Sequence, residues 1–237
     1  MKSRVPHPSW IEVDLGQFRK NIEVVRGRIG KALYCLPVKA NAYGHGLKEI
    51  GRAAEEAGVD YLGVAHLQEG IELRDARVKI PILVLGAIHE DQIDDLIAHQ
   101  LEFSISSKMK ADFVAKRCEG KCRVHLEVDT GMHRTGVRSS TAIELMRHLR
   151  DLKVFDVVGI YSHFATAGDA FATRQMETFQ VLLMEPIFKE QPLIRHIANS
   201  SGITHFPPLD MVRPSLITFG YGAREGVAPC FALKSKV

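Results

Sequence analysis

A lysine at the end of an apolar run is the residue of this 237-residue sequence that most clearly offers reactive chemistry. Lys39 directly follows the run from Leu33 to Val38, which predicts a buried strand of a parallel sheet. An ammonium group there loses hydration, which lowers its pKa and frees the amine as a nucleophile. An imine-forming lysine requires such an amine. The competing interpretation is a lysine whose charged head reaches solvent, as most lysines do.

Polar residues follow four other apolar runs in the same way, at Asp129–Arg134, Ser162–Phe164, Asn199–Gly202 and Arg213–Ser215. The Asn-Ser-Ser-Gly turn and the turn at Ser215 and Leu216 offer hydroxyls and backbone N–H groups at expected helix starts. That arrangement binds a phosphate. Turns of this composition are also common on protein surfaces, and Arg213 before a proline equally suits a surface ion pair.

A metal site is a second interpretation of the polar residues. His125, Glu127 and Asp129 alternate along one expected strand and therefore share a face, and His163 lies one strand further on. A barrel hydrolase uses such a set to activate water. The sequence favours instead a polar layer that fills the barrel interior, because no second His-rich element accompanies these residues.

The elements that must position these groups alternate between short β-branched runs and amphipathic stretches. The expected strands are Leu33–Val38, Tyr61–Val64, Ile82–Leu85, Glu102–Ile105, Val124–Val128, Val157–Ile160, Ile194–Ala198 and a short one around Met211 and Val212. The expected helices are Leu47–Ala57, Leu67–Arg74, Asp91–His99, Lys108–Lys116, Thr141–Leu149 and Phe171–Met184, several with Ser, Thr or Asp at the cap.

Eight strand-helix units in about 190 residues predict an α/β fold, a closed (β/α)₈ barrel. In such a barrel, the loops that follow the strands share one face. The lysine, the arginines, the histidine and the amide-rich turns would therefore converge there. This convergence, rather than any single residue, predicts a phosphate-bearing carbonyl cofactor.

Composition excludes several other classes. The chain is 46% hydrophobic and 25% charged, as ordinary globular proteins are. Lys+Arg 31 against Asp+Glu 28 gives a net charge of +3 without a long basic run, so nucleic acid is not an expected partner. No apolar stretch is long enough to span a membrane and no signal peptide opens the chain, which predicts a cytoplasmic protein. The four cysteines, Cys35, Cys118, Cys122 and Cys230, are then expected to be reduced thiols, with Cys35 packed in a strand.

The run Pro37-Val-Lys-Ala-Asn-Ala-Tyr-Gly-His-Gly46 resembles the pyridoxal-phosphate attachment motif of bacterial alanine racemases. The resemblance continues, in family order and spacing, through Val128-Asp-Thr-Gly-Met-His-Arg134, Ser162-His-Phe-Ala165, Ala198-Asn-Ser200 and Met211-Val-Arg-Pro214. From Trp10 onward it covers the N-terminal barrel domain of that family.

The resemblance implies roles for individual residues. Lys39 would hold pyridoxal 5'-phosphate as a Schiff base and act as the base on one face of the substrate α-carbon. The phosphate would be bound by Tyr43, by Ser200 in the turn that begins at Asn199, and by the turn at Ser215 and Leu216. The pyridine nitrogen would face Arg213, the cofactor's phenolic oxygen and the substrate carboxylate would meet Arg134, and His163 would link Arg213 to the opposite-face base.

An arginine against the pyridine nitrogen has a physical logic. Arg213 is a permanent cation that donates hydrogen bonds, so the ring nitrogen facing it stays unprotonated. The ring then becomes a weaker electron sink, which favours return of the proton to the α-carbon over transamination. This is the fidelity that a racemase requires.

Two positions depart from the family pattern. Seven residues before Arg134 the family often has a carbamylated lysine, and here Glu127 is expected to hold Arg134 in place with its own carboxylate. Ser215 stands where glycine is common, so the phosphate turn must accommodate a β-carbon and gains a hydroxyl.

The ends of the chain contain two strand-like segments, one from Trp10 to Asp14 before a helix over Leu15–Ile29, and one from Pro229 onward. Neither fits inside the barrel, and both are expected to lack their pairing strands. The resemblance implies a strand and helix over residues 1–30, a barrel over 31–226 and the start of a truncated C-terminal β-domain over 227–237. That domain supplies the tyrosine on the other face, from the partner chain of a homodimer.

The predicted function is therefore interconversion of L- and D-alanine, with little or no activity in this chain without the C-terminal domain. A stand-alone protein that binds pyridoxal phosphate without turnover is the alternative, and a metal-dependent barrel hydrolase is a third hypothesis. Membranes are not expected partners.

Overall fold

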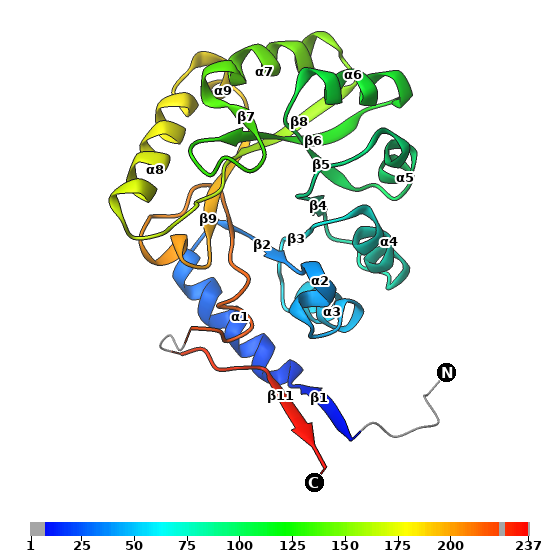
Figure 1. The fold of residues 1–237 in the computed structure, drawn as a ribbon, viewed down its shortest axis with the longest axis vertical. Coiled ribbons are helices and arrows are strands. Elements are labelled where there is room, and N and C mark those ends of the chain that lie inside the picture. Colours follow the sequence, from blue (N-terminus) through cyan, green and yellow to red (C-terminus); the bar gives the residue numbers. More distant parts are fainter. Residues whose placement is uncertain (1–7, 223–225, 237) are drawn as a thin grey trace.

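Eight parallel strands close into a barrel in the computed structural model, which describes residues 8–222 and 226–236. Neighbours around the barrel are β5, β4, β3, β2, β10, β9, β8 and β6, and the pairing of β5 with β6 completes the ring (Figure 1). The strands are β2 (Leu33–Pro37), β3 (Tyr61–Val64), β4 (Ile82–Val84), β5 (Glu102–Ile105), β6 (Cys122–Asp129), β8 (Phe155–Tyr161), β9 (Ile194–Asn199) and β10 (Met211–Arg213). The predicted α/β barrel is confirmed, with all eight expected strands in it.

Helices surround the barrel on the outside (Figure 1). They are α1 (Leu15–Ile29), α3 (Leu47–Glu56), α4 (Leu67–Asp75), α5 (Ile93–Ala98), α6 (Lys108–Arg117), α7 (Ala142–Asp151), α8 (Ala170–Leu183) and the short α9 (Pro186–Lys189). Side-chain caps explain several starts, since Asp14, Ser107 and Asp169 each accept a backbone N–H of the first turn. The seven predicted helices are confirmed within a few residues at each end, although a 3₁₀ turn forms the beginning of two of them. The short α2 (Lys39–Tyr43), β7 (Val137–Arg138) and α9 were not predicted.

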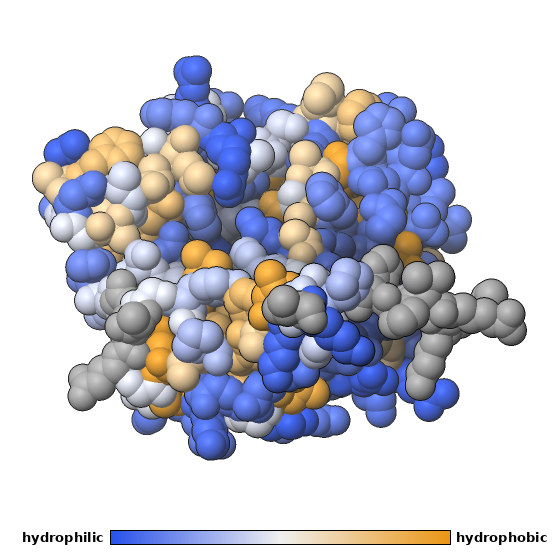
Figure 2. Space-filling model, turned by 60° about the horizontal axis from the view of Figure 1, so that its bottom comes forward, coloured by the Kyte–Doolittle hydropathy of each residue, from blue (hydrophilic) through white to orange (hydrophobic). Residues whose placement is uncertain are grey.

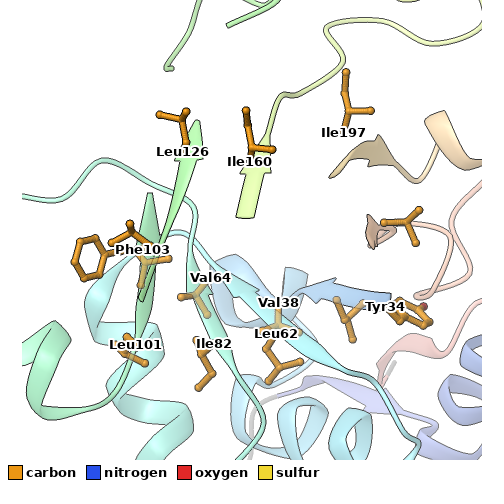
Figure 3. Packing of buried hydrophobic residues seen from close by; sticks show 14 of the residues in the cluster. Tyr34, Val38, Leu62, Val64, Ile82, Leu101, Phe103, Leu126, Ile160 and Ile197 are labelled. Carbon is orange, nitrogen blue, oxygen red and sulfur yellow. The ribbon is translucent and has the colours of Figure 1, made fainter. Parts of the chain in front are cut away.

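The core lies between the strands and the helices. Side chains from adjacent strands, among them Leu62, Phe103, Leu126 and Ile160, belong to one buried cluster (Figure 3). Because side chains alternate along a strand, the neighbours of Leu126 in β6 point to the barrel interior instead. The interior therefore receives polar groups from β6, while Cys35, Tyr61, Leu83 and Met211 of other strands form a second, smaller apolar cluster.

The two strand-like end segments pair with one another. β1 (Ser9–Val13) and β11 (Phe231–Ser235) form an antiparallel ribbon in the register Ser9↔Ser235 to Val13↔Phe231. This corrects the expectation that both lack a partner, because residues more than 200 positions apart meet beside α1 (Figure 1). The ribbon is largely exposed, and on this side of the molecule apolar residues lie scattered among hydrophilic ones (Figure 2).

The prediction of four reduced cysteines was wrong for two of them, because Cys118 and Cys122 form a disulfide. Cys118 caps α6 and Cys122 begins β6, so the loop between them folds back and brings the two Cα atoms to 6.8 Å. Cys35 is buried in β2 as expected, and Cys230 is also a buried free thiol. Of the helices in the described ranges, none is long and apolar enough to cross a bilayer.

Candidate active site

A cavity of about 520 Å³ opens where the barrel strands end. All nine residues predicted for the site line it: Lys39, Tyr43, Arg134, His163, Asn199, Ser200, Arg213, Ser215 and Leu216. They come from segments that are far apart in the sequence, such as those after β2 and β10, and the closure of the barrel brings these segments together. A volume of this size suits a cofactor together with a small substrate.

Lys39 is the first residue of α2 and lies two residues after the end of β2. The residue before it, Val38, is fully buried, whereas Lys39 itself is exposed at the cavity. The expectation that the strand end buries this amine is therefore wrong. The strand ends at Pro37, and the chain turns away at the next residues so that the side chain of Lys39 leaves the barrel wall.

The turn after Lys39 is left-handed. Residues 40–43 have φ between 52° and 54°, a region that costs a residue with a side chain about 1–2 kcal/mol. Hydrogen bonds offset part of this cost: Glu69 accepts the backbone N–H of Ala40 at 2.6 Å, and Asn41 accepts that of Leu47 at 2.8 Å. The turn keeps Lys39 and Tyr43 on the same cavity.

Hydroxyl groups and backbone N–H groups gather at one end of the cavity. The Tyr43 hydroxyl donates to Ser215 Oγ at 3.1 Å, and burial raises the pKa of this tyrosine. Ser200 Oγ accepts the backbone N–H of Ser215 at 2.8 Å and that of Ile217 at 3.4 Å. A phosphate group needs donors of this kind, three hydroxyls and nearby amides.

The turns themselves differ from the expected helix starts. Asn199 Oδ1 accepts the N–H groups of Ser201 and Gly202, and only a 3₁₀ turn over Gly202–Thr204 follows. After Arg213 the chain continues in turns to Gly222. Asn and Ser side chains stabilise such turns locally, which is why the composition did not distinguish a turn from a helix start. Leu216 is exposed at the edge of the cavity.

Arg213 is the most deeply buried cation that lines the cavity, with 2% of its surface exposed. Its Nη2 donates to the backbone carbonyl of Ser162 at 2.7 Å and to Nδ1 of His163 at 3.1 Å. Its guanidinium group also lies 5.0 Å from the ring centre of Tyr161. These contacts fix its position from three sides.

His163 is neutral in this environment. Burial, followed by the positive charges of Arg213, Arg134 and Lys39, lowers its pKa to about 3. Because a guanidinium group only donates, Nδ1 of His163 must accept, and the proton of the neutral ring is on Nε2. His163 thus contacts Arg213 through one hydrogen bond and lines the cavity. Its link to an opposite-face base stays a prediction.

The metal interpretation has no ligand set. His125 is bonded to Glu102 and His196, and Asp129 to His133. In the part of the chain that the structure describes, no three His, Cys, Asp or Glu side chains converge in a way that suits a metal ion.

The comparisons with known proteins agree with this geometry. Residues 13–223 match the family model described as alanine racemase, N-terminal domain. The chain belongs to the alanine racemase family. It is 38% identical to an alanine racemase of Symbiobacterium thermophilum over 93% of this chain, and 36% identical to one of Methanococcus maripaludis over 97%. A solved alanine racemase from Streptomyces lavendulae has a TM-score of 0.91 and 30% identity over 98% of this chain.

The chain spans only part of each of these relatives. It covers 61% and 66% of the two curated alanine racemases and 66% of the solved one. What matches is therefore their barrel region, as the sequence predicted.

One departure from the alanine racemase pattern behaves differently from the expectation. Glu127 is buried and accepts a hydrogen bond from Thr135 Oγ1 at 2.6 Å. No ion pair joins it to Arg134 within residues 8–222 and 226–236, so the expected carboxylate support of that arginine was wrong. The hydroxyl of Thr135, rather than Arg134, is therefore the donor to this carboxylate. Burial raises the pKa of Glu127.

The other departure is accommodated. The turn after β10 contains Ser215, and the hydroxyl of this residue accepts the hydrogen bond of Tyr43. The sequence missed Tyr161, which lines the cavity from the end of β8, and Glu69, which supports the turn after Lys39. Tyr161 was detectable, because it directly precedes the predicted Ser162 loop. Nothing in the position of Glu69 along the sequence indicates its contact with the backbone N–H of Ala40.

Proposed function

We propose that this chain is the barrel of an alanine racemase, which binds pyridoxal 5'-phosphate at Lys39 and interconverts L- and D-alanine. One observation carries the proposal: a single cavity at the ends of the strands brings together an amine, two guanidinium groups and a corner of hydroxyls. Membership of the alanine racemase family supports the choice of substrate.

The donor chemistry of the cavity fits the cofactor. The phosphate suits the corner formed by Tyr43, Ser200 and Ser215, where hydroxyls and backbone N–H groups lie within hydrogen-bond distance of one another. The aldehyde carbon suits the amine of Lys39, and the ring nitrogen suits Arg213. The phosphate corner and the two cations line the same cavity, as the two ends of one ligand require.

When bound, pyridoxal phosphate supplies an electron-withdrawing ring attached to the amino acid nitrogen, which acidifies the α-carbon. On one face of that carbon, Lys39 would remove the proton from one enantiomer or deliver it to form the other, and a second group would do the reverse on the opposite face. Arg213 would donate to the ring nitrogen without giving up its proton, which would limit the acidification and favour return of the proton. Arg134 would bind the phenolic oxygen and the substrate carboxylate, and His163 would link Arg213 to the base on the opposite face.

Reduction with borohydride in the presence of pyridoxal phosphate, followed by peptide mapping, tests the cofactor site. We expect the pyridoxyl group on Lys39 as a secondary amine, and its loss in Lys39→Arg. The matched control is Lys110→Arg, a half-buried lysine outside the cavity whose change should leave the labelled peptide unaltered. Label on another lysine, or none, would refute the site.

Activity of the 237-residue chain is a separate question. We propose that it racemises alanine slowly at most, because the relatives continue for a further third of their length and one general acid–base group contributes about 10²–10⁴ in rate. We also propose a cytoplasmic location and a homodimer for the complete protein. A labelled Lys39 without any turnover in the complete protein would favour the alternative, a protein that binds the cofactor without catalysis.

A further inference from the structure

A continuous row of hydrogen bonds crosses the barrel interior below the cavity. Nη1 of Arg213 lies 2.5 Å from Nδ1 of His196, and Nε2 of His196 lies 2.9 Å from Nδ1 of His125. Nε2 of His125 lies 3.0 Å from Oε2 of Glu102, whose other oxygen accepts from Arg123 at 2.8 Å. The row connects four strands of the barrel: β10, β9, β6 and β5.

The row also runs from one end of the barrel to the other. Arg213 is the last residue of β10 and lines the cavity at the ends of the strands. Glu102 is the first residue of β5, and together with Arg123 it lines a second cavity of about 340 Å³ where the strands begin. The two charged groups are thus held at opposite ends of the interior.

The direction of every hydrogen bond follows from Arg213. A guanidinium group has no acceptor, so Nδ1 of His196 must accept, and the proton of that ring is on Nε2. That Nε2–H donates to Nδ1 of His125, whose own proton is then also on Nε2 and is donated to the carboxylate of Glu102. Both imidazoles are therefore neutral, in the same tautomer, and point the same way.

The surroundings agree with this assignment. Both rings are fully buried, and burial lowers the pKa of His125 and of His196. Burial alone would raise the pKa of Glu102, but the hydrogen bonds from His125 and Arg123 hold it below its usual value. A neutral pair between a cation and a carboxylate is consistent with all three shifts.

Close packing constrains the planes of both rings. Tyr161 stacks on His196 with ring centres 4.9 Å apart. A β-carbon at Gly159 would lie 2.2 Å from Nδ1 of His125, so the glycine makes room for that ring. Which nitrogen lies at each end of a ring is then decided by the hydrogen bonds of the row.

We infer that Glu102, His125 and His196 are positioning residues for Arg213, with the Glu102 carboxylate as the final acceptor of the row. Hydrogen bonds that all run in one direction strengthen one another, and each imidazole is held by a partner at both of its nitrogens. The three residues hold the guanidinium group against the cavity in one orientation. That they thereby serve the cofactor's ring nitrogen rests on the proposed function.

Nitrogen-15 NMR of the full chain with labelled histidine and arginine tests the inference. Without any cofactor, His125 and His196 are expected to show unprotonated Nδ1 and protonated Nε2, unchanged between about pH 5 and 8. The Glu102→Gln variant keeps an acceptor but removes the charge, so it should shift the signals of His196 and of the Arg213 guanidinium group, two and three hydrogen bonds away. Glu102→Asp, which keeps a carboxylate, should restore them toward the original values.

The matched control is Tyr34→Phe in β2. Tyr34 is fully buried and its hydroxyl lies 2.6 Å from that of Thr218, but it has no contact with the row. Loss of this hydroxyl should leave the two tautomers and the Arg213 signals in place. The inference is overturned if either histidine has its proton on Nδ1 or is charged, or if Glu102→Gln alters His125 alone. Because these measurements need no cofactor, failure of the chain to bind pyridoxal phosphate would refute the proposed function and leave the row intact.

Discussion

The hydroxyl of Tyr43 donates a hydrogen bond to the hydroxyl of Ser215 at 3.1 Å, across 172 residues of sequence. The two belong to the turns that follow β2 and β10, which are neighbours in the barrel. The pairing of these strands therefore builds the corner of the cavity to which we assign the phosphate. This corner offers hydroxyl groups rather than charged side chains to a ligand.

We expect Tyr43→Phe to weaken binding of pyridoxal phosphate by about 10- to 100-fold. A hydrogen bond to a charged group contributes about 1.5–3 kcal/mol, and tenfold in affinity corresponds to about 1.4 kcal/mol. The dissociation constant is measured by absorbance titration of the full chain. The same change at the exposed Tyr221 should leave the affinity alone, and an unchanged affinity in Tyr43→Phe would remove this residue from the phosphate corner.

The left-handed turn after Lys39 leads to a prediction about stability. Ala40 has a φ of 53° and is exposed, so glycine relieves a cost of about 1–2 kcal/mol while adding about 0.5–1 kcal/mol of backbone entropy in the unfolded chain. We expect Ala40→Gly to raise the free energy of unfolding by about 0.5–1 kcal/mol in urea titrations. Ala115→Gly in the regular helix α6 should lower it by a similar amount. A loss of stability in both variants would mean that the turn is not left-handed in solution.

Much of the fold and of the site could be predicted from the sequence. The β-branched runs indicated the eight strands, and the rule that loops after the strands share a face brought Lys39, Arg134 and Arg213 together. The left-handed turn could not be predicted, because Lys-Ala-Asn-Ala-Tyr is compatible with an ordinary helix. The contact of Glu102 with His125 was equally hidden, since it depends on the register of two strands.

The buried histidines predict how stability depends on pH. The pKa of His163 is about 3 in the folded chain, below its ordinary value of 6.5, so the unfolded chain binds the proton more readily. The stability that the neutral ring provides is present above pH 6.5 and is lost as pH falls toward 3, by at most about 1.4 kcal/mol per pH unit for one group. Burial also lowers the pKa of His125 and of His196, so these two rings likewise make the chain less stable as pH falls.

Urea unfolding at a series of pH values measures this effect. We expect His163→Asn to reduce the slope of stability against pH in the window between 6.5 and 3, whereas the same change at the exposed His89 leaves the slope as it was. A slope that is identical in the His163→Asn variant and in the original chain would contradict a neutral His163.

Because Gly159 leaves space for the ring of His125, we expect a change of glycine to alanine to destabilise the chain at Gly159 and to stabilise it at Gly27. In Gly159→Ala, the new β-carbon would lie within 2.2 Å of Nδ1 and 2.5 Å of Cε1 of His125, and the ring is held by Glu102 and His196. Overpacking of this kind costs about 1–3 kcal/mol, so this variant should unfold at lower urea concentration. Gly27 in helix α1 has nothing within 4 Å of a built β-carbon, and Gly27→Ala should therefore stabilise the chain by about 1 kcal/mol. If Gly159→Ala is as stable as the original chain, His125 has another position available, and the row of hydrogen bonds to Arg213 is not rigid.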